Sequence, residues 1–126
     1  MQKDNNTTVD DLKKKMSIFI KERDWQKFHS PKNLAMSIAI EAAELMEHFQ
    51  WISSEDAIKI KDNNENINDI KDELSDILSY CLSLANYLDI DITDSFIKKM
   101  EKNKKKYPEE LAYGKNTKYN KLEKNN

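Results

Sequence analysis

Apolar residues recur at helical spacing along most of this chain, and start signals divide the pattern into separate helices. Two threonines precede two aspartates in capping-box spacing at residues 7–11, and an apolar stripe follows, which predicts a first helix over about residues 8–22. Ser30 followed by Pro31 is typical of an N-cap and a first helical residue. A second helix is therefore expected over about residues 31–51.

The second half of the chain predicts two further long helices and a short one. Residues 53–56 resemble the cap of a short helix, and the polar run 62–66 is the expected loop. A third long helix is predicted over 67–89, with apolar residues on more than half of its circumference. A fourth begins after a turn and cap at 91–93 and is stopped by Pro108. The breadth of the apolar surface on the third helix predicts that a second subunit covers part of it.

Two pairs of carboxylates interrupt these apolar surfaces. Glu41 and Glu44 share the apolar stripe of the second helix, and Glu73 and Asp76 repeat the same three-residue spacing on the third. A single acid of this kind is usually a solvated helix carboxylate, but two pairs on apolar flanks would converge inside one bundle. Buried anions cost several kcal/mol each unless they are compensated, so the pattern predicts a bound cation.

The chemistry of the ligands narrows the choice of metal. The four side chains offer only oxygen atoms, which select Mg²⁺ or Mn²⁺ over zinc. Di-iron bundles use Glu-x-x-His pairs, whereas both fourth positions here are acids. A magnesium cluster without another nucleophile usually serves phosphate chemistry, in which the metal bridges phosphate oxygens and activates a water molecule.

Other residues could complete a nucleotide site. Lys99, Asn103 and Lys106 lie on one face of the fourth helix and could meet a triphosphate, although a solvated basic helix is the alternative. Aromatic and histidine side chains could hold a base by stacking and edge hydrogen bonds, although each is more often a core residue than a ligand. These side chains are Trp25, Phe28, His29, Trp51 and Tyr80.

Composition supports an all-α fold in a single domain. The 126 residues include one glycine and two prolines, with 38% hydrophobic and 35% charged residues, which favours long helices over strands. We expect one domain over 1–126, with a polar leader over about 1–7 and a disordered tail over about 115–126. The net charge of -2 disfavours nucleic acid as a partner. With a lone Cys81 and no apolar run that could span a membrane, the sequence predicts a cytoplasmic protein.

These residues together resemble the MazG-like nucleoside triphosphate pyrophosphohydrolases, most of all their dCTP pyrophosphatase branch. The resemblance covers about residues 9–121 in unbroken order. The motifs that carry it are Arg23-Asp24-Trp25 with Phe28-His29, Pro31 and Asn33, then Glu41-x-x-Glu44, Phe49-Gln50-Trp51, Glu73-Leu74-Ser75-Asp76, and Lys99-Met100 with Asn103 and Tyr107-Pro108. Met16 and Lys106 are departures, because some relatives have a polar side chain at the first position and many have Arg at the second.

The resemblance implies a helical bundle of four main helices and a short one, assembled as a dimer or tetramer that completes its core. It implies hydrolysis of an NTP or dNTP to the monophosphate and diphosphate, with dCTP or a modified pyrimidine as a candidate substrate and nucleotide-pool house-cleaning as the role. Glu41, Glu44, Glu73 and Asp76 would hold Mg²⁺, and the aromatic residues from Trp25 to His29, with Trp51 and Tyr80, would surround the nucleoside.

Three alternatives stay open at this stage. Glu47 either orients or deprotonates the attacking water, or is a structural acid. The enzyme could instead act on dUTP or phosphoribosyl-ATP. A non-catalytic bundle whose acids bind a regulatory cation or a basic partner is the third possibility.

Overall fold

The computed structural model describes residues 1–122, apart from the side chain of Asn64, and no strand occurs in that range. The expected all-α fold is confirmed. The chain forms two compact units, Met1–Ile90 and a second that starts at Asp91. The first unit holds α1 (Val9–Glu22), η1 (Gln26–Phe28), α2 (Pro31–Glu47), α3 (Ser54–Ile58), η2 (Lys59–Asp62) and α4 (Asn64–Tyr87), and the second holds α5 (Ile92–Lys106), α6 (Glu109–Ala112) and η3 (Tyr119–Lys121).

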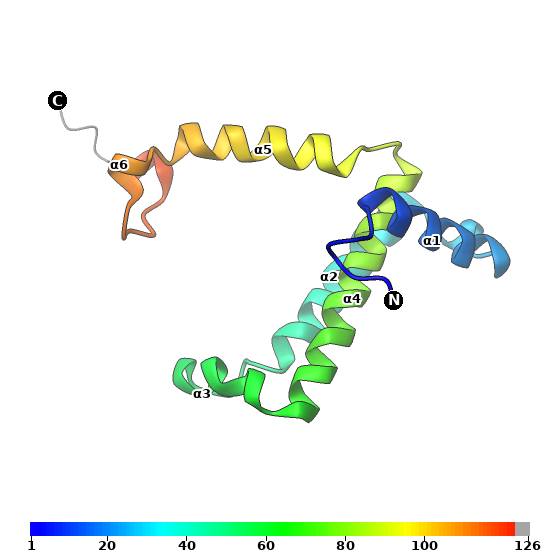
Figure 1. Cartoon of the computed structure of the whole chain (residues 1–126), viewed down its shortest axis with the longest axis horizontal. Coiled ribbons are helices and arrows are strands. Elements are labelled where there is room, and N and C mark those ends of the chain that lie inside the picture. The colour runs from blue at the N-terminus through cyan, green and yellow to red at the C-terminus, as the bar shows by residue number, and fades with distance from the viewer. Residues whose placement is uncertain (123–126) are drawn as a thin grey trace. The chain divides into compact units, whose positions relative to one another are not determined.

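Helix α4 is the central element of the first unit. Helix α2 packs along it and α1 packs against it, as Figure 1 shows. The most deeply buried apolar side chains come from all three helices: Ile20 from α1, Leu34 from α2, and Leu82 and Ala85 from α4. This small core fixes the positions of the acidic residues, since two of them lie on α2 and two on α4.

Side-chain caps start the helices where the sequence predicts. The Thr8 hydroxyl accepts a hydrogen bond from the Asp11 amide at 3.1 Å, and the Asp11 carboxylate accepts one from the Thr8 amide at 2.9 Å. Ser30 caps α2 and Ser53 caps the short helix α3 in the same manner. The expected first helix, short helix and second-helix start are confirmed.

Two boundaries differ from the prediction. Helix α2 ends at Glu47 rather than near 51, because the amides of His48 and Phe49 bond to carbonyls only three residues back. Helix α4 starts at Asn64, three residues earlier than expected, because the Asn63 side chain accepts a hydrogen bond from the Asn66 amide and acts as its N-cap. The expected loop over 62–66 is therefore mostly helical.

Two aspartates close helices in a conformation that usually favours glycine. Asp24 and Asp89 have φ angles of 51° and 53°. After each one the next amide reaches back five residues, from Trp25 to the Ile20 carbonyl and from Ile90 to the Ala85 carbonyl. The first of these turns directs the chain from α1 into the segment that carries Trp25 and His29.

The second unit is built around the end of α5. Asp91 caps this helix by accepting a hydrogen bond from the Asp94 amide at 2.8 Å, as the expected turn and cap require. Beyond Pro108, η3 returns toward α5, and the Tyr119 ring packs edge-on against Tyr107 at 6.2 Å. The tail that was expected to be disordered is described as far as residue 122, while residues 123–126 lie outside the described residues.

No helix in the described part of the chain combines the length and apolar character that crossing a membrane requires. The lone Cys81 is half-buried on α4, and burial raises the pKa of its thiol.

Candidate metal and nucleotide site

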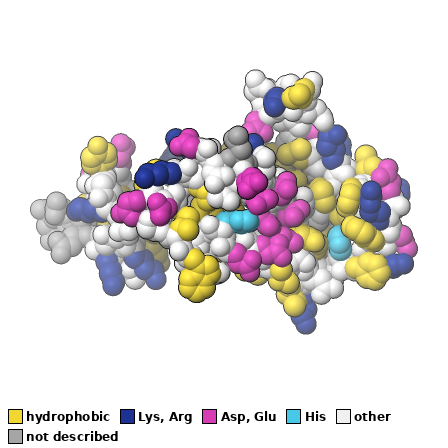
Figure 2. All heavy atoms as spheres, turned by 90° about the horizontal axis from the view of Figure 1, so that it is seen from below, with side chains coloured by type: hydrophobic (Ala, Val, Ile, Leu, Met, Phe, Trp, Pro, Cys, Tyr) yellow, Lys and Arg dark blue, Asp and Glu magenta, His cyan; other side chains and the backbone are white. Residues whose placement is uncertain are grey.

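Three of the four predicted acids meet between α2 and α4. Carboxylate oxygens of Glu41, Glu73 and Asp76 lie within 4.8 Å of one another, close enough to share one cation. The i, i+3 spacing on each helix turns both acids of a pair toward the neighbouring helix. Figure 2 shows acidic side chains gathered on one face of the molecule, with a histidine among them.

Burial and the repulsion between neighbouring carboxyl groups determine the electrostatics of this cluster. Burial, reinforced by the neighbouring Glu44 carboxyl and by Asp76 and Glu73, raises the pKa of Glu41 to about 7. Burial and Glu44 also raise the pKa of Glu73, against the opposing effect of His48. Without a cation, Glu41 therefore retains its proton up to about pH 7, which reduces the repulsion within the cluster.

Two carboxylate oxygens in this cluster lack a protein partner. Glu41 Oε2 and Glu73 Oε2 are buried, and neither has a hydrogen-bond partner among the described residues. A buried acceptor without a partner is costly, and a hard divalent cation is the ligand that oxygen-only donors prefer. The residues present therefore fit Mg²⁺ or Mn²⁺, with Glu41, Glu73 and Asp76 as the ligands that the geometry brings together.

The fourth predicted ligand and the acid predicted to act on the attacking water are not part of this group of three. Glu44 is exposed, but its carboxyl is a near neighbour of both Glu41 and Glu73, as its effect on their pKa values shows. Glu47 is the exposed last residue of α2 and is not among the three that converge.

His48 was missed by the sequence reasoning. Its Nε2 atom lies 3.8 Å from Glu73 Oε1, and both side chains are largely buried. A signal existed, since His48 follows Glu44 by four residues and Glu41 by seven and so lies on the same helical face.

A cavity of about 400 Å³ begins at Asp76 and extends between α1 and α4. Three of the predicted base-binding residues line it: Trp25, His29 and Tyr80. The His29 ring lies 6.4 Å from both the Trp25 and Tyr80 rings, and its Nδ1 atom is buried without a partner among the described residues. These three residues thus form one aromatic wall next to the acids.

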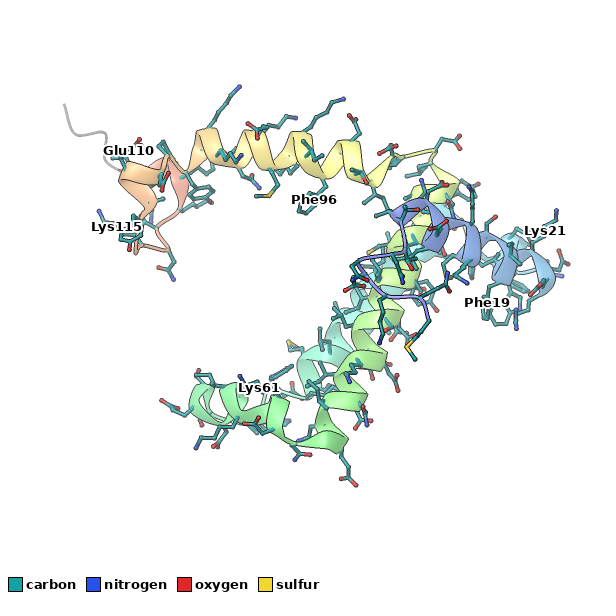
Figure 3. All side chains as sticks on the ribbon, in the orientation of Figure 1. Phe19, Lys21, Lys61, Phe96, Glu110 and Lys115 are labelled. Atoms are coloured by element: carbon teal, nitrogen blue, oxygen red, sulfur yellow. The ribbon has the colours of Figure 1, made fainter. Side chains whose placement is uncertain are left out.

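Helix α1 contributes a second, apolar wall to the same cavity. Met16, Phe19 and Ile20 line it, and the Phe19 ring packs edge-on against Trp25 at 5.7 Å. Figure 3 shows Phe19 and Lys21 projecting from the last turns of α1. In the sequence Met16 is notable as a departure from the family pattern, whereas no role at the site is predicted for Phe19 or Ile20.

Serines on α4 are a further feature that the sequence reasoning missed. Ser75, Ser79 and Ser83 recur every four residues, and each hydroxyl donates to the carbonyl four residues before it, at 2.6 to 2.9 Å. Ser79 and Ser83 line the cavity. Their four-residue spacing in the sequence could have indicated that these serines share one face of the helix.

Two other predicted aromatic residues, Phe28 and Trp51, are exposed. Phe28 is exposed beneath Lys27, whose Nζ lies 5.4 Å from the ring centroid, and Trp51 is 85% exposed in the turn after α2. Neither lines the cavity. Lys99, Asn103 and Lys106 lie on α5 in the second unit, where the Lys106 ammonium is 4.9 Å from the Tyr119 ring centroid.

The raised pKa values predict how the metal-free protein responds to pH. The folded state holds a proton on Glu41 up to about pH 7, whereas the unfolded chain releases it near the ordinary pKa of 4.5. The stabilising effect is therefore complete below pH 4.5 and is lost as pH rises through 7. Chemical denaturation in EDTA should show a free energy of unfolding that falls across this window, less steeply in Glu41→Gln. Exposed Asp69→Asn is the control, and a flat or rising profile would contradict the raised pKa.

Comparison with known proteins identifies the family. The model of the MazG-like family matches residues 36–122. Rat dCTP pyrophosphatase 1 is 35% identical over 115 residues, which cover 91% of this chain and 68% of the rat protein, and the human dCTP pyrophosphatase 1 is 33% identical over the same coverage.

A solved structure agrees with the sequence relatives. The crystal structure of a pyrophosphatase from Archaeoglobus fulgidus superimposes with a TM-score of 0.73 at 38% identity, covering 79% of this chain and 92% of the archaeal one. The family model, the sequence relatives and the shared fold thus agree with the paired acids on α2 and α4. The chain belongs to the MazG-like family and is a nucleotide pyrophosphohydrolase.

Proposed function

We propose that this protein hydrolyses a deoxynucleoside triphosphate between the α and β phosphates, with dCTP or a modified pyrimidine nucleotide as its substrate. The observation that carries the proposal is the juxtaposition of the acid cluster with an aromatic cavity. Asp76 belongs to both, so phosphates held at the acids would leave the base within reach of Trp25, His29 and Tyr80. The curated relatives named dCTP pyrophosphatase support the choice of substrate.

Glu41, Glu73 and Asp76 would hold Mg²⁺ or Mn²⁺, with Glu44 close enough to join them or to bond to a metal-bound water. When bound, the metal supplies positive charge for the phosphate oxygens and lowers the pKa of a water molecule. Glu47 orients or deprotonates the attacking water in this proposal. Its exposed position at the end of α2 leaves the structural role as the alternative.

Residues outside the acid cluster would bind the nucleotide. Lys99, Asn103 and Lys106 provide two ammonium groups and an amide for the triphosphate. Trp25 and Tyr80 contact the base by stacking, and His29 Nδ1, which is buried without a partner among the described residues, forms an edge hydrogen bond to it. Phe28 and Trp51 remain predicted nucleoside contacts that lie outside the cavity of the single chain.

One assay tests the reaction and the substrate together. A panel of canonical and modified NTPs and dNTPs, with dUTP and phosphoribosyl-ATP included, is incubated with Mg²⁺ while diphosphate and orthophosphate are measured separately. The proposal requires diphosphate and a nucleoside monophosphate in equal amounts. Orthophosphate as the first product, or no metal-dependent turnover with any nucleotide, would contradict it.

Removing ligand charge should abolish turnover without unfolding the protein. Glu41→Gln and Asp76→Asn keep the size of each side chain but remove one negative charge, so we expect activity to fall by orders of magnitude, about 100-fold or more. The melting temperature without metal should be unchanged or higher, because repulsion is relieved. The Mg²⁺-induced rise in melting temperature should shrink in both variants. Retained turnover in both would refute the ligand assignment.

The aromatic wall should affect substrate binding more than chemistry. Tyr80→Ala removes a stacking contact worth roughly 1 to 3 kcal/mol, and KM should rise accordingly while kcat changes less. His29→Ala should change the ranking among bases, because a ring nitrogen reads an edge whereas stacking tolerates every base. Trp51→Ala is the comparison variant: a KM as high as that of Tyr80→Ala would place Trp51 at the nucleoside in the assembled enzyme. Loss of folding in Tyr80→Ala would make it a core residue.

We further propose that this cytoplasmic protein is a single functional domain that works as a homo-oligomer, a dimer or tetramer. Large apolar side chains remain exposed on the two central helices: Met36 and Ile40 on α2, and Leu74 and Leu78 on α4, each 48 to 57% exposed. Each pair is spaced by four residues and so forms a stripe along its helix. A second copy of the chain would cover these stripes.

Oligomerisation can be measured directly. At micromolar concentration the protein should sediment as a dimer or larger species, whereas a compact monomer of about 14.9 kDa would contradict the proposal. Ile40→Glu with Leu78→Glu should shift the equilibrium toward monomer by burying charge at the interface. Exposed Ile18→Glu on α1 is the matched control.

A further inference from the structure

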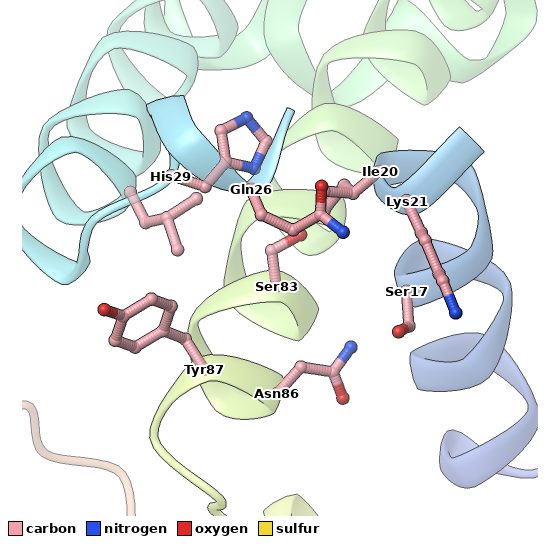
Figure 4. A pocket seen from close by; sticks show the side chains of 9 residues that line it. Ser17, Ile20, Lys21, Gln26, His29, Ser83, Asn86 and Tyr87 are labelled. Carbon is pink, nitrogen blue, oxygen red and sulfur yellow. The ribbon is translucent and has the colours of Figure 1, made fainter. Parts of the chain in front are cut away.

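A second cavity adjoins the one that holds the aromatic wall. It has a volume of about 200 Å³ and shares Ile20, His29 and Ser83 with the larger cavity. Figure 4 shows side chains from α1, from η1 and from α4 around it. The two cavities therefore meet at Ile20, His29 and Ser83, and Asp76 lines only the larger one.

The two cavities follow one another along α4. Asp76, Ser79 and Ser83 line the first, and Ser83 and Asn86 line the second. From Asp76 to Asn86 the helix advances ten residues, or about 15 Å at 1.5 Å per residue. If the phosphates of a nucleotide lie at Asp76, the edge of the base farthest from the sugar would therefore face the second cavity.

The lining of the second cavity has a distinct chemical character. Lys21 provides an ammonium group, Ser17 and Tyr87 provide hydroxyls, and Gln26 provides an amide. Aspartate and glutamate are absent from the residues that line it. Asn86 is held in place by a hydrogen bond from its Nδ2 atom to the Lys13 carbonyl at 2.9 Å. Beside the apolar side chains of Ile20 and Leu34, the cavity thus offers several hydrogen-bond donors and one positive charge, which can pair with an anionic group at its polar side.

We propose that the second cavity is a subsite for an anionic substituent, such as a carboxylate, on the base of the nucleotide, with Lys21 as its charge partner. This inference rests on the proposed function, since it takes the phosphates to be held at the acid cluster. Lys21 is exposed, so its effect is that of a partly solvated ion pair.

Paired substrates test the subsite. The ratio of kcat/KM for 5-carboxy-dCTP to that for 5-methyl-dCTP compares a charged with a neutral group at the same carbon. Lys21→Met should lower this ratio about two- to fivefold, the range expected for an exposed ion pair. Lys15→Met, which removes a charge from the same helix outside both cavities, should leave it unchanged. An equal ratio in wild type and Lys21→Met would overturn the proposal.

A variant that fills the second cavity tests whether the substituent needs that space, independently of the charge on Lys21. Ser17 lines the second cavity and not the first, so Ser17→Phe should fill it and impair hydrolysis of 5-carboxy-dCTP while sparing dCTP. Equal loss with both substrates would show that the substituent does not enter this cavity.

Binding of the reaction products separates this inference from the proposed function. Calorimetry in the presence of Mg²⁺, with dCMP and 5-carboxy-dCMP as the probes, needs no turnover because both are reaction products. Tighter binding of the carboxylated monophosphate in wild type, lost in Lys21→Met, would support the subsite even if the enzyme failed to hydrolyse either triphosphate. Equal binding of the two monophosphates, together with normal hydrolysis of dCTP, would refute the subsite and leave the proposed function standing.

Discussion

Repulsion among carboxylates that the helices force together is the constraint on which this structure depends. Glu41 and Glu44 on α2 face Glu73 and Asp76 on α4, and burial together with the neighbouring acids raises the pKa values of Glu41 and Glu73. Leu34 and the buried residues of α4 hold the two helices in contact despite it. A cation relieves the repulsion only while the helices stay together, so packing and metal binding support each other.

The first unit buries few apolar side chains that could offset the repulsion among the carboxylates. Among the described residues, the deeply buried apolar side chains are Ile20, Leu34, Leu82 and Ala85, whereas Leu74 and Leu78 are exposed on the same helix that carries Glu73 and Asp76. Covering those side chains in an assembly would add apolar burial next to the acids. In this view the oligomer stabilises the helix pair that holds the site.

The sequence predicted the parts of the site that depend on local spacing. The caps at Thr8, Ser30 and Ser53 follow from helix geometry and are confirmed. The i, i+3 spacing of the acids predicted their convergence, and the structure brings three of the four together, while their role as metal ligands stays a prediction. The end of α2 could not be predicted, because alternative short-range bonds at His48 decide it. The second cavity could not be predicted either, because it forms where α1, η1 and α4 pack together and no local sequence pattern indicates that packing.

Helix α4 also sets a fixed distance between the acid cluster and the aromatic cavity. Asp76, a proposed metal ligand, and the cavity-lining serines lie on one continuous helix, and the spacing between Asp76 and Ser83 is fixed at about 10 Å by the helical rise. Neither end can move toward the other without breaking the helix, so under the proposed function the helix, and not the substrate, would set the separation between phosphate and base. A nucleotide analogue with a longer or shorter link between phosphate and base would not place both groups at their contacts at the same time, even if each group fitted its own contacts.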